Sequence, residues 1–168
     1  MTSKMKILSA ERKRVFDGIP KLTDDEVIGF TAQDLKTKKI TRTMKSDTNK
    51  VGFLIQRAYF QAKGRFFEVK KFKTENINKA TRALGIKAKI NITDYSPTTA
   101  SLHKYKILEL FGWQAYNDDD RKMLQEHATL LVDKQNNSET ILFSLLDQCW
   151  KNKIEVPSYN EFTTIIGG

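Results

Sequence analysis

The sequence predicts an all-α, multi-helical fold, with two small helical lobes and helix-turn-helix-like elements. Three observations favour this class. Residues that cap helices precede segments in which apolar side chains recur at helical spacing, and glycines follow several of those segments. The three prolines fall between the segments, where proline is tolerated. About eight or nine helices with short connections are typical of an all-helical protein.

Five helices are expected in the first half of the chain. The longest, over residues 48–62, is apolar on most faces and is followed by Gly64, so it should lie in the middle of its lobe. The others are shorter, and each follows a capping residue. They are residues 10–16 after Ser9, 24–30 after a capping box of Thr23 and Glu26, a short helix through Leu35 capped by Thr31, and 74–84 between Thr74 and Gly85.

The second half begins with a weakly patterned stretch. Ile90 and Ile92 alternate as in a strand, but one short strand has no partner. Residues 89–97 are therefore predicted to link a lobe of residues 1–88 to a lobe of residues 98–168. Four helices are expected in this second lobe: one opened by Pro97 and Thr98–Thr99 and running to Phe111, one from Asn117 to about residue 132, one over residues 139–151 after Asn137–Ser138, and one over residues 159–166 after a capping box of Ser158 and Glu161.

Several classes of protein are disfavoured by the composition. No apolar stretch is long enough to span a membrane, and the first residues lack the apolar core of a signal peptide, so we expect no membrane partner. The single cysteine, Cys149, excludes an intramolecular disulfide and fits a reducing compartment. We therefore expect a cytoplasmic protein.

The positive charge is unevenly distributed along the chain. Residues 1–90 hold 22 Lys or Arg and 9 Asp or Glu, a net charge of +13, whereas residues 91–168 hold 7 and 11, a net charge of −4. Such an asymmetry places a positive field on one part of the molecule and suits a polyanionic partner.

The strongest local feature is a basic segment over residues 36–45, expected to connect two helices. It contains five basic residues and three threonines but no acid. Such residues neutralise and hydrogen-bond phosphates, which predicts contact with DNA; the alternative is a solvated connection on a basic protein. The basic residues of this segment are Lys36, Lys38, Lys39, Arg42 and Lys45, and the charge continues with Arg57, Lys63, Arg65, Lys70 and Lys71.

A helix, a basic connection and a second helix resemble a helix-turn-helix with an extended turn. In that geometry the start of the second helix meets base edges, and here it contains Thr48, Asn49 and Lys50. Asparagine can pair with adenine, and lysine can donate to guanine. The alternative is that Asp47 or Thr48 only caps the helix.

The sequence offers little for catalysis. Asp118–Asp120 suggest a metal site, but three successive helical residues point in different directions, and acids in a first turn complement the helix dipole. His127 and Cys149 fall near apolar faces, and no phosphate-binding loop or zinc spacing is present. We expect no enzymatic activity, no metal and no cofactor.

Four segments resemble the N-terminal region of Tn-three-type transposases, which are replicative and form cointegrates. The segments occur in the family's order: Asn49-Lys-Val-Gly52-Phe53-Leu-Ile-Gln56, Gly64-Arg65, Thr99-Ala-Ser-Leu-His103 and Phe111-Gly-Trp-Gln-Ala-Tyr116. The resemblance implies a DNA-binding region that recognises terminal inverted repeats, with the catalytic RNase-H-like domain downstream. It also adds Thr99, Ser101, His103 and Lys104 as expected DNA contacts of the second lobe.

This chain departs from the family pattern at two positions. Ala100 stands where the family has arginine, which puts one contact of the second lobe in doubt. Lys50 also replaces an arginine, so the charge is kept but the guanidinium fork is lost.

We therefore expect a non-catalytic DNA-binding domain of a transposase, with double-stranded DNA at transposon ends as its partner. The alternative is a stand-alone or truncated regulatory or partner-binding module that competes for the same ends. A homodimer in the context of a full-length protein stays open, as does the question of which lobe reads bases.

Overall fold

The computed structural model describes residues 6–168 except residues 24, 27–28 and 30–33. The described residues form eight α-helices and two short 3-10 turns and contain no strand, which confirms the all-α prediction. None of the described helices is both long enough and apolar enough to cross a membrane.

The helices form two compact units, which differ from the predicted lobes. The central unit is Ile19–Gly112, and the terminal unit combines Trp113–Gly168 with the described residues up to Gly18. The predicted division into residues 1–88, 89–97 and 98–168 therefore places the first helix and the helix that ends at Phe111 in the wrong units.

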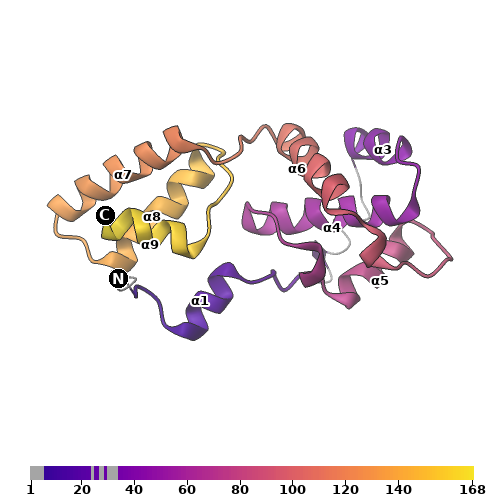
Figure 1. The fold of residues 1–168 in the computed structure, drawn as a ribbon, viewed down its shortest axis with the longest axis horizontal. Coiled ribbons are helices and arrows are strands. Elements are labelled where there is room, and N and C mark those ends of the chain that lie inside the picture. The colour runs from indigo at the N-terminus through magenta and orange to yellow at the C-terminus, as the bar shows by residue number, and fades with distance from the viewer. Residues whose placement is uncertain (1–5, 24, 27–28, 30–33) are drawn as a thin grey trace. The chain divides into compact units, whose positions relative to one another are not determined.

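The central unit is built around its longest helix. α4 (Asp47–Lys63) packs against both α5 (Thr74–Ala83) and α6 (Pro97–Phe111), as Figure 1 shows. All ten residues from Val51 to Phe60 are buried, which confirms the expectation that this helix lies in the middle of its unit. Gly64 ends α4 in the left-handed conformation, with φ of 68°, as predicted. The unit also contains α3 (Leu35–Arg42) and two 3-10 turns, η1 (Val69–Lys71) and η2 (Ile92–Asp94).

The predicted link between lobes is instead part of the central core. Tyr95, which follows η2, is only 2% exposed. Its ring lies so close to Gly52 that a Cβ at that position would be 2.3 Å from Tyr95 Cε2. Only glycine allows this approach, and the contact joins residues 89–97 to α4. The sequence pattern missed it because the two partners lie far apart along the chain.

The terminal unit is a small helical bundle with its own core. α7 (Asp118–Asp133), α8 (Ser138–Lys151) and α9 (Tyr159–Gly167) pack against one another around Leu124, Leu142, Leu145 and Phe162. Gln114 reinforces the bundle by pairing with the segment after α8. Its N–H donates to Lys153 O, and its carbonyl accepts from Glu155 N, both at 2.9 Å.

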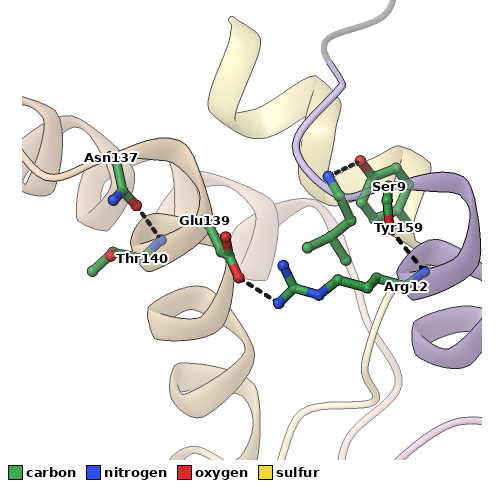
Figure 2. Close-up of polar contacts among 7 residues, drawn as sticks. Ser9, Arg12, Asn137, Glu139, Thr140 and Tyr159 are labelled. Atoms are coloured by element: carbon green, nitrogen blue, oxygen red, sulfur yellow. Dashed lines mark hydrogen bonds and ion pairs between the residues drawn. The ribbon is translucent and has the colours of Figure 1, made fainter.

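The N-terminal helix α1 (Ala10–Asp17) is tied to this bundle by polar contacts, some of which Figure 2 shows. The hydroxyl of Tyr159 accepts hydrogen bonds from Ile7 N at 3.0 Å and Leu8 N at 2.9 Å. Arg12 forms an ion pair with Glu139 on α8. These contacts place α1 in the terminal unit although its sequence neighbours belong to the central unit.

Several predicted helix starts are confirmed. The side chains of Ser9, Asn117, Asn137 and Ser158 each accept a hydrogen bond from the first turn of the helix that follows. The capping box of Thr23 and Glu26 is also present, with both reciprocal bonds at 3.2 Å. The body of the helix predicted after it, and the cap predicted at Thr31, fall on or beside positions outside the described residues.

One predicted cap is wrong by one residue. Lys73, not Thr74, precedes α5 and makes no side-chain capping bond. α6 begins at Pro97, as predicted, and Ser96 caps it by accepting from Thr99 N at 3.1 Å. Proline suits this first position because its missing N–H has no helical partner there.

Candidate nucleic-acid interface

The basic segment lies on a helix, not on the extended connection that the sequence suggested. Asp34 accepts from Thr37 N at 2.7 Å and starts α3, which runs to Arg42. This hydrogen bond, assisted by the charge of Arg57, holds the pKa of the Asp34 carboxyl below its usual range. The helix dipole also stabilises a charged carboxylate at a helix N-terminus. A cap one residue before Leu35 therefore turns the expected loop into a helix.

α3 has one buried side, and its basic side chains point elsewhere. Thr37 is 0% exposed and Thr41 is 6% exposed. The cations Lys36, Lys38, Lys39 and Arg42 are exposed, as is Lys45 in the turn that follows. None of these five forms a salt bridge with another described residue. The helix therefore presents a row of uncompensated positive charge.

The start of α4 is only partly accessible. Ser46 caps the helix by accepting from Asn49 N at 3.2 Å, so neither Asp47 nor Thr48 is the cap. Thr48, Asn49 and Lys50 are half-buried, and the helix is fully buried from Val51 to Phe60. An insertion of α4 along its length into a DNA groove would require its core face to be uncovered. The more exposed helix of this pair is α3.

Arg57 and Arg65 are not surface cations, contrary to the prediction. Arg57 is 7% exposed and Arg65 is 8% exposed. The Arg57 guanidinium lies 5.5 Å from the centre of the Phe111 ring, and its Nη2 lies 3.9 Å from Asp34 Oδ2. Desolvation lowers the pKa of Arg57, and the charge of Asp34 opposes this effect. Arg57 therefore connects α4 to the cap of α3 and to α6, and a structural role replaces the predicted phosphate contact.

The remaining cations of the first half differ in their surroundings. Lys70 and Lys71 are exposed on η1, and Lys70 Nζ lies 3.1 Å from Glu68 Oε2. Lys63 is half-buried at the end of α4. The free cations of α3 are therefore better placed for a polyanion than Lys70, which already has an acidic partner.

The resemblance-based contacts on α6 divide into accessible and buried residues. Ser101 is exposed and Thr99 is half-buried. The ammonium of Lys104 lies over the Phe66 ring, 5.4 Å from its centre. His103 is 4% exposed, and its Nδ1 lies 2.6 Å from the hydroxyl of Tyr95. His103 is thus a core residue, and the prediction of a DNA contact there is wrong.

The segments that carry the family resemblance meet in the core of the central unit. Gln56 donates to the Tyr95 hydroxyl at 2.6 Å and to Ala100 O at 3.1 Å. The rings of Phe53 and His103 lie edge to face, with centres 5.3 Å apart. With the approach of Tyr95 to Gly52, these contacts join α4, η2 and α6. The motif residues therefore build the scaffold that holds α3, and they are not themselves the surface.

Sequence reasoning missed Lys106, which lines a groove together with Lys36 and Lys39. Its position on α6 carries no signal in the sequence, because the groove exists only where α3 lies beside α6. The family resemblance predicted a DNA contact at Lys104, two residues earlier, and not at Lys106.

The division into units reduces the charge asymmetry but keeps its sign. By sequence, Ile19–Gly112 contains 19 Lys or Arg and 9 Asp or Glu, a net charge of +10, whereas the rest of the chain contains 10 and 11, a net charge of −1. The positive field therefore belongs to the unit that contains α3.

The acids of α7 have a structural role at its first turn. Asp120 accepts from Asn117 N at 3.1 Å and from Gln114 Nε2 at 2.7 Å, and Asn117 accepts from Asp120 N at 3.0 Å. No group of His, Cys, Asp or Glu suited to a metal ion occurs among the residues that the structure describes.

Cys149 is 0% exposed, and burial raises the pKa of its thiol to about 12, as expected of a core residue.

Comparison with other proteins gives one informative result. No curated protein matches this sequence. Residues 7–167 match a family described as a domain of unknown function, DUF4158. Because the match covers nearly the whole chain and both of its units, the protein belongs to the DUF4158 family.

Proposed function

We propose that this chain is a non-catalytic DNA-binding domain of a transposase, and that it recognises the terminal inverted repeats of its transposon in double-stranded DNA. The observation that carries the proposal is α3, whose cations are exposed and form no salt bridge with another described residue. It belongs to a unit with a net charge of +10.

The context of the family supports the transposase part of the proposal. DUF4158 domains are often found in transposases. The finer assignment to the Tn-three type rests on the four sequence segments that resemble that group. A cytoplasmic location and a homodimer in the full-length context belong to the same proposal.

The dimensions of α3 suit a DNA groove. An α-helix with its side chains is about 10–12 Å in diameter, and the major groove of B-DNA is about 12 Å wide. Lys38, Lys39 and Arg42 can reach phosphates, and arginine can also pair with guanine at a base edge. Thr48, Asn49 and Lys50 follow in the chain and are half-exposed, so they can add contacts beside α3.

A binding titration tests the proposal directly. The full chain is titrated into a labelled duplex that carries the inverted repeat flanking its gene, and into a scrambled duplex of the same length and composition. We expect binding to both, with the inverted repeat preferred by about 1,000-fold or more, as is usual for specific recognition. Equal affinities would reject recognition of transposon ends, and no binding to either duplex would reject the DNA-binding function itself.

A further inference from the structure

A groove with a volume of about 610 Å³ separates α3 from α6 within the central unit. Its half-buried lining residues Ile40 and Leu110 are apolar, whereas its exposed lining residues include three lysines and one acid. The lysines are Lys36 and Lys39 from α3 and Lys106 from α6, and the acid is Glu109. Two helices that are distant in sequence therefore concentrate positive charge around one cavity.

The residues of α3 that line this groove and those that face solvent lie on different sides of the helix. Successive residues are about 100° apart, so Lys36 and Ile40 share one side and Leu35, Lys38 and Arg42 share another. The third side carries Thr37 and Thr41 and is buried. Lys39 lies between the two accessible sides. α3 thus has two basic surfaces, and only one of them faces α6.

The lysines are the donors that remain available in the groove. None of the three forms a salt bridge with a described residue. The hydroxyl of Thr43, which also lines the groove, already donates to Ile40 O at 2.7 Å. An ammonium group has three N–H donors and no acceptor, so its natural ligand here is an anion.

We propose that this groove lies against phosphate groups of the DNA backbone and that Lys36, Lys39 and Lys106 each contact one of them, while the side of α3 that carries Lys38 and Arg42 faces the base edges. The inference rests on the proposed function and deepens it, because it assigns the two accessible sides of α3 to different parts of DNA. Phosphate contacts fix the position of a helix on the duplex without reading sequence. Lys106 would add α6 to that positioning.

The test is a set of charge-removing variants of the full chain, measured on the inverted-repeat duplex between 50 and 200 mM salt. One phosphate contact contributes about 0.9 to the slope of log K against log salt. Lys106→Gln should therefore flatten the slope by about 0.9. The factor by which this variant binds more weakly than wild type should then become about 3.5-fold smaller as the salt rises from 50 to 200 mM. Lys36→Gln, from the opposite wall of the groove, should have the same effect. Glu109→Gln should tighten binding, because Glu109 is the one acid among the described residues that line the groove.

Lys122→Gln is the matched control, since Lys122 is an exposed lysine on α7 in the terminal unit. Its slope should equal that of wild type, and far-ultraviolet circular dichroism should show equal helix content in all variants. If wild type binds DNA but Lys106→Gln and Lys36→Gln behave like Lys122→Gln, the groove holds no phosphate, and an acidic peptide becomes the better occupant. If wild type itself shows no binding, the proposed function fails, and the phosphate site fails with it.

Discussion

At the scale of single residues, His103 shows how the core of the central unit controls protonation. The Tyr95 hydroxyl accepts from Gln56 and lies 2.6 Å from His103 Nδ1, so it can donate to that nitrogen only when the imidazole is neutral. Burial, aided by the charge of Lys106, lowers the pKa of His103 from 6.5 to about 4. The folded protein therefore keeps His103 neutral at pH values at which an unfolded chain would protonate it.

This shift predicts a loss of stability in acid. Between pH 6.5 and about 4 the unfolded state binds a proton at this position that the folded state does not, so the free energy of unfolding should fall as the pH falls. Above pH 6.5 the contribution of His103 is fully present. Urea titrations at pH 7.5, 5.5 and 4.5 should show a smaller acid-dependent loss for His103→Gln than for wild type. Equal losses in both proteins would show that His103 does not control this range.

Residue identity alone did not separate surface cations from buried ones. Lys36, Lys38 and Lys39 are exposed as the charge pattern predicts, but Arg57 is buried against Asp34 and Phe111. The position of Arg57 on a helix that is covered on every side decides its role. That coverage comes from α5 and α6, which the local sequence around Arg57 does not encode.

At the scale of elements, α4 is the main source of stability in the central unit. Leu54 is 0% exposed, so Leu54→Ala leaves a cavity and should lower the free energy of unfolding by about 2–5 kcal/mol. Leu102→Ala is the control, because Leu102 is 60% exposed on α6 and should change stability by less than about 0.5 kcal/mol. Urea denaturation followed by circular dichroism measures both. Similar losses for the two variants would contradict the central position of α4.

The attachment of α1 depends more on Tyr159 than on the visible ion pair in Figure 2. Tyr159→Phe removes the acceptor of two N–H groups, those of Ile7 and the buried Leu8, and should cost about 1–3 kcal/mol. Arg12→Ala breaks an exposed ion pair with Glu139 and should leave the unfolding midpoint nearly unchanged. Thermal unfolding of the two variants compares them. A larger loss for Arg12→Ala would show that the ion pair anchors the helix.

Most helices were predictable because their signals are local. Ser9, Asn117 and Asn137 cap the helices expected after them, and Gly64 and Gly112 adopt positive φ at the ends of α4 and α6. α3 was misread because its cap, Asp34, was passed over in favour of Thr31, and a run of lysines and threonines resembles a loop. Lysine favours a helix and threonine does not, so propensity alone is ambiguous here, and Asp34, together with the burial of Thr37 and Thr41, decides the outcome.

At the scale of the whole molecule, the separation of charge predicts where salt acts. If about six cations of the central unit reach phosphates, log K should fall against log salt with a slope of roughly −5. Removing Lys36 and Lys39 together should flatten this slope by about 2. Removing Lys151 and Lys153, which are exposed in the terminal unit, should leave it unchanged. Fluorescence anisotropy with the inverted-repeat duplex measures all three proteins.

Two results would contradict the prediction that the cations of the central unit carry the salt dependence of binding. A wild-type slope near zero would mean that the positive field of the central unit does not meet phosphates. Equal losses from the two double variants would mean that general basicity, and not the position of the charge, drives binding.

Along the chain, α1 precedes the central unit and α7, α8 and α9 follow it, and all four helices belong to the terminal unit. During synthesis on a ribosome, α1 therefore emerges before the central unit but gains its partner Tyr159 only after the whole central unit has been made. The central unit, whose residues are contiguous, can complete its core before that moment. The same arrangement means that a protease cutting once, either near Gly18 or near Gly112, leaves the two units covalently joined through the other crossing.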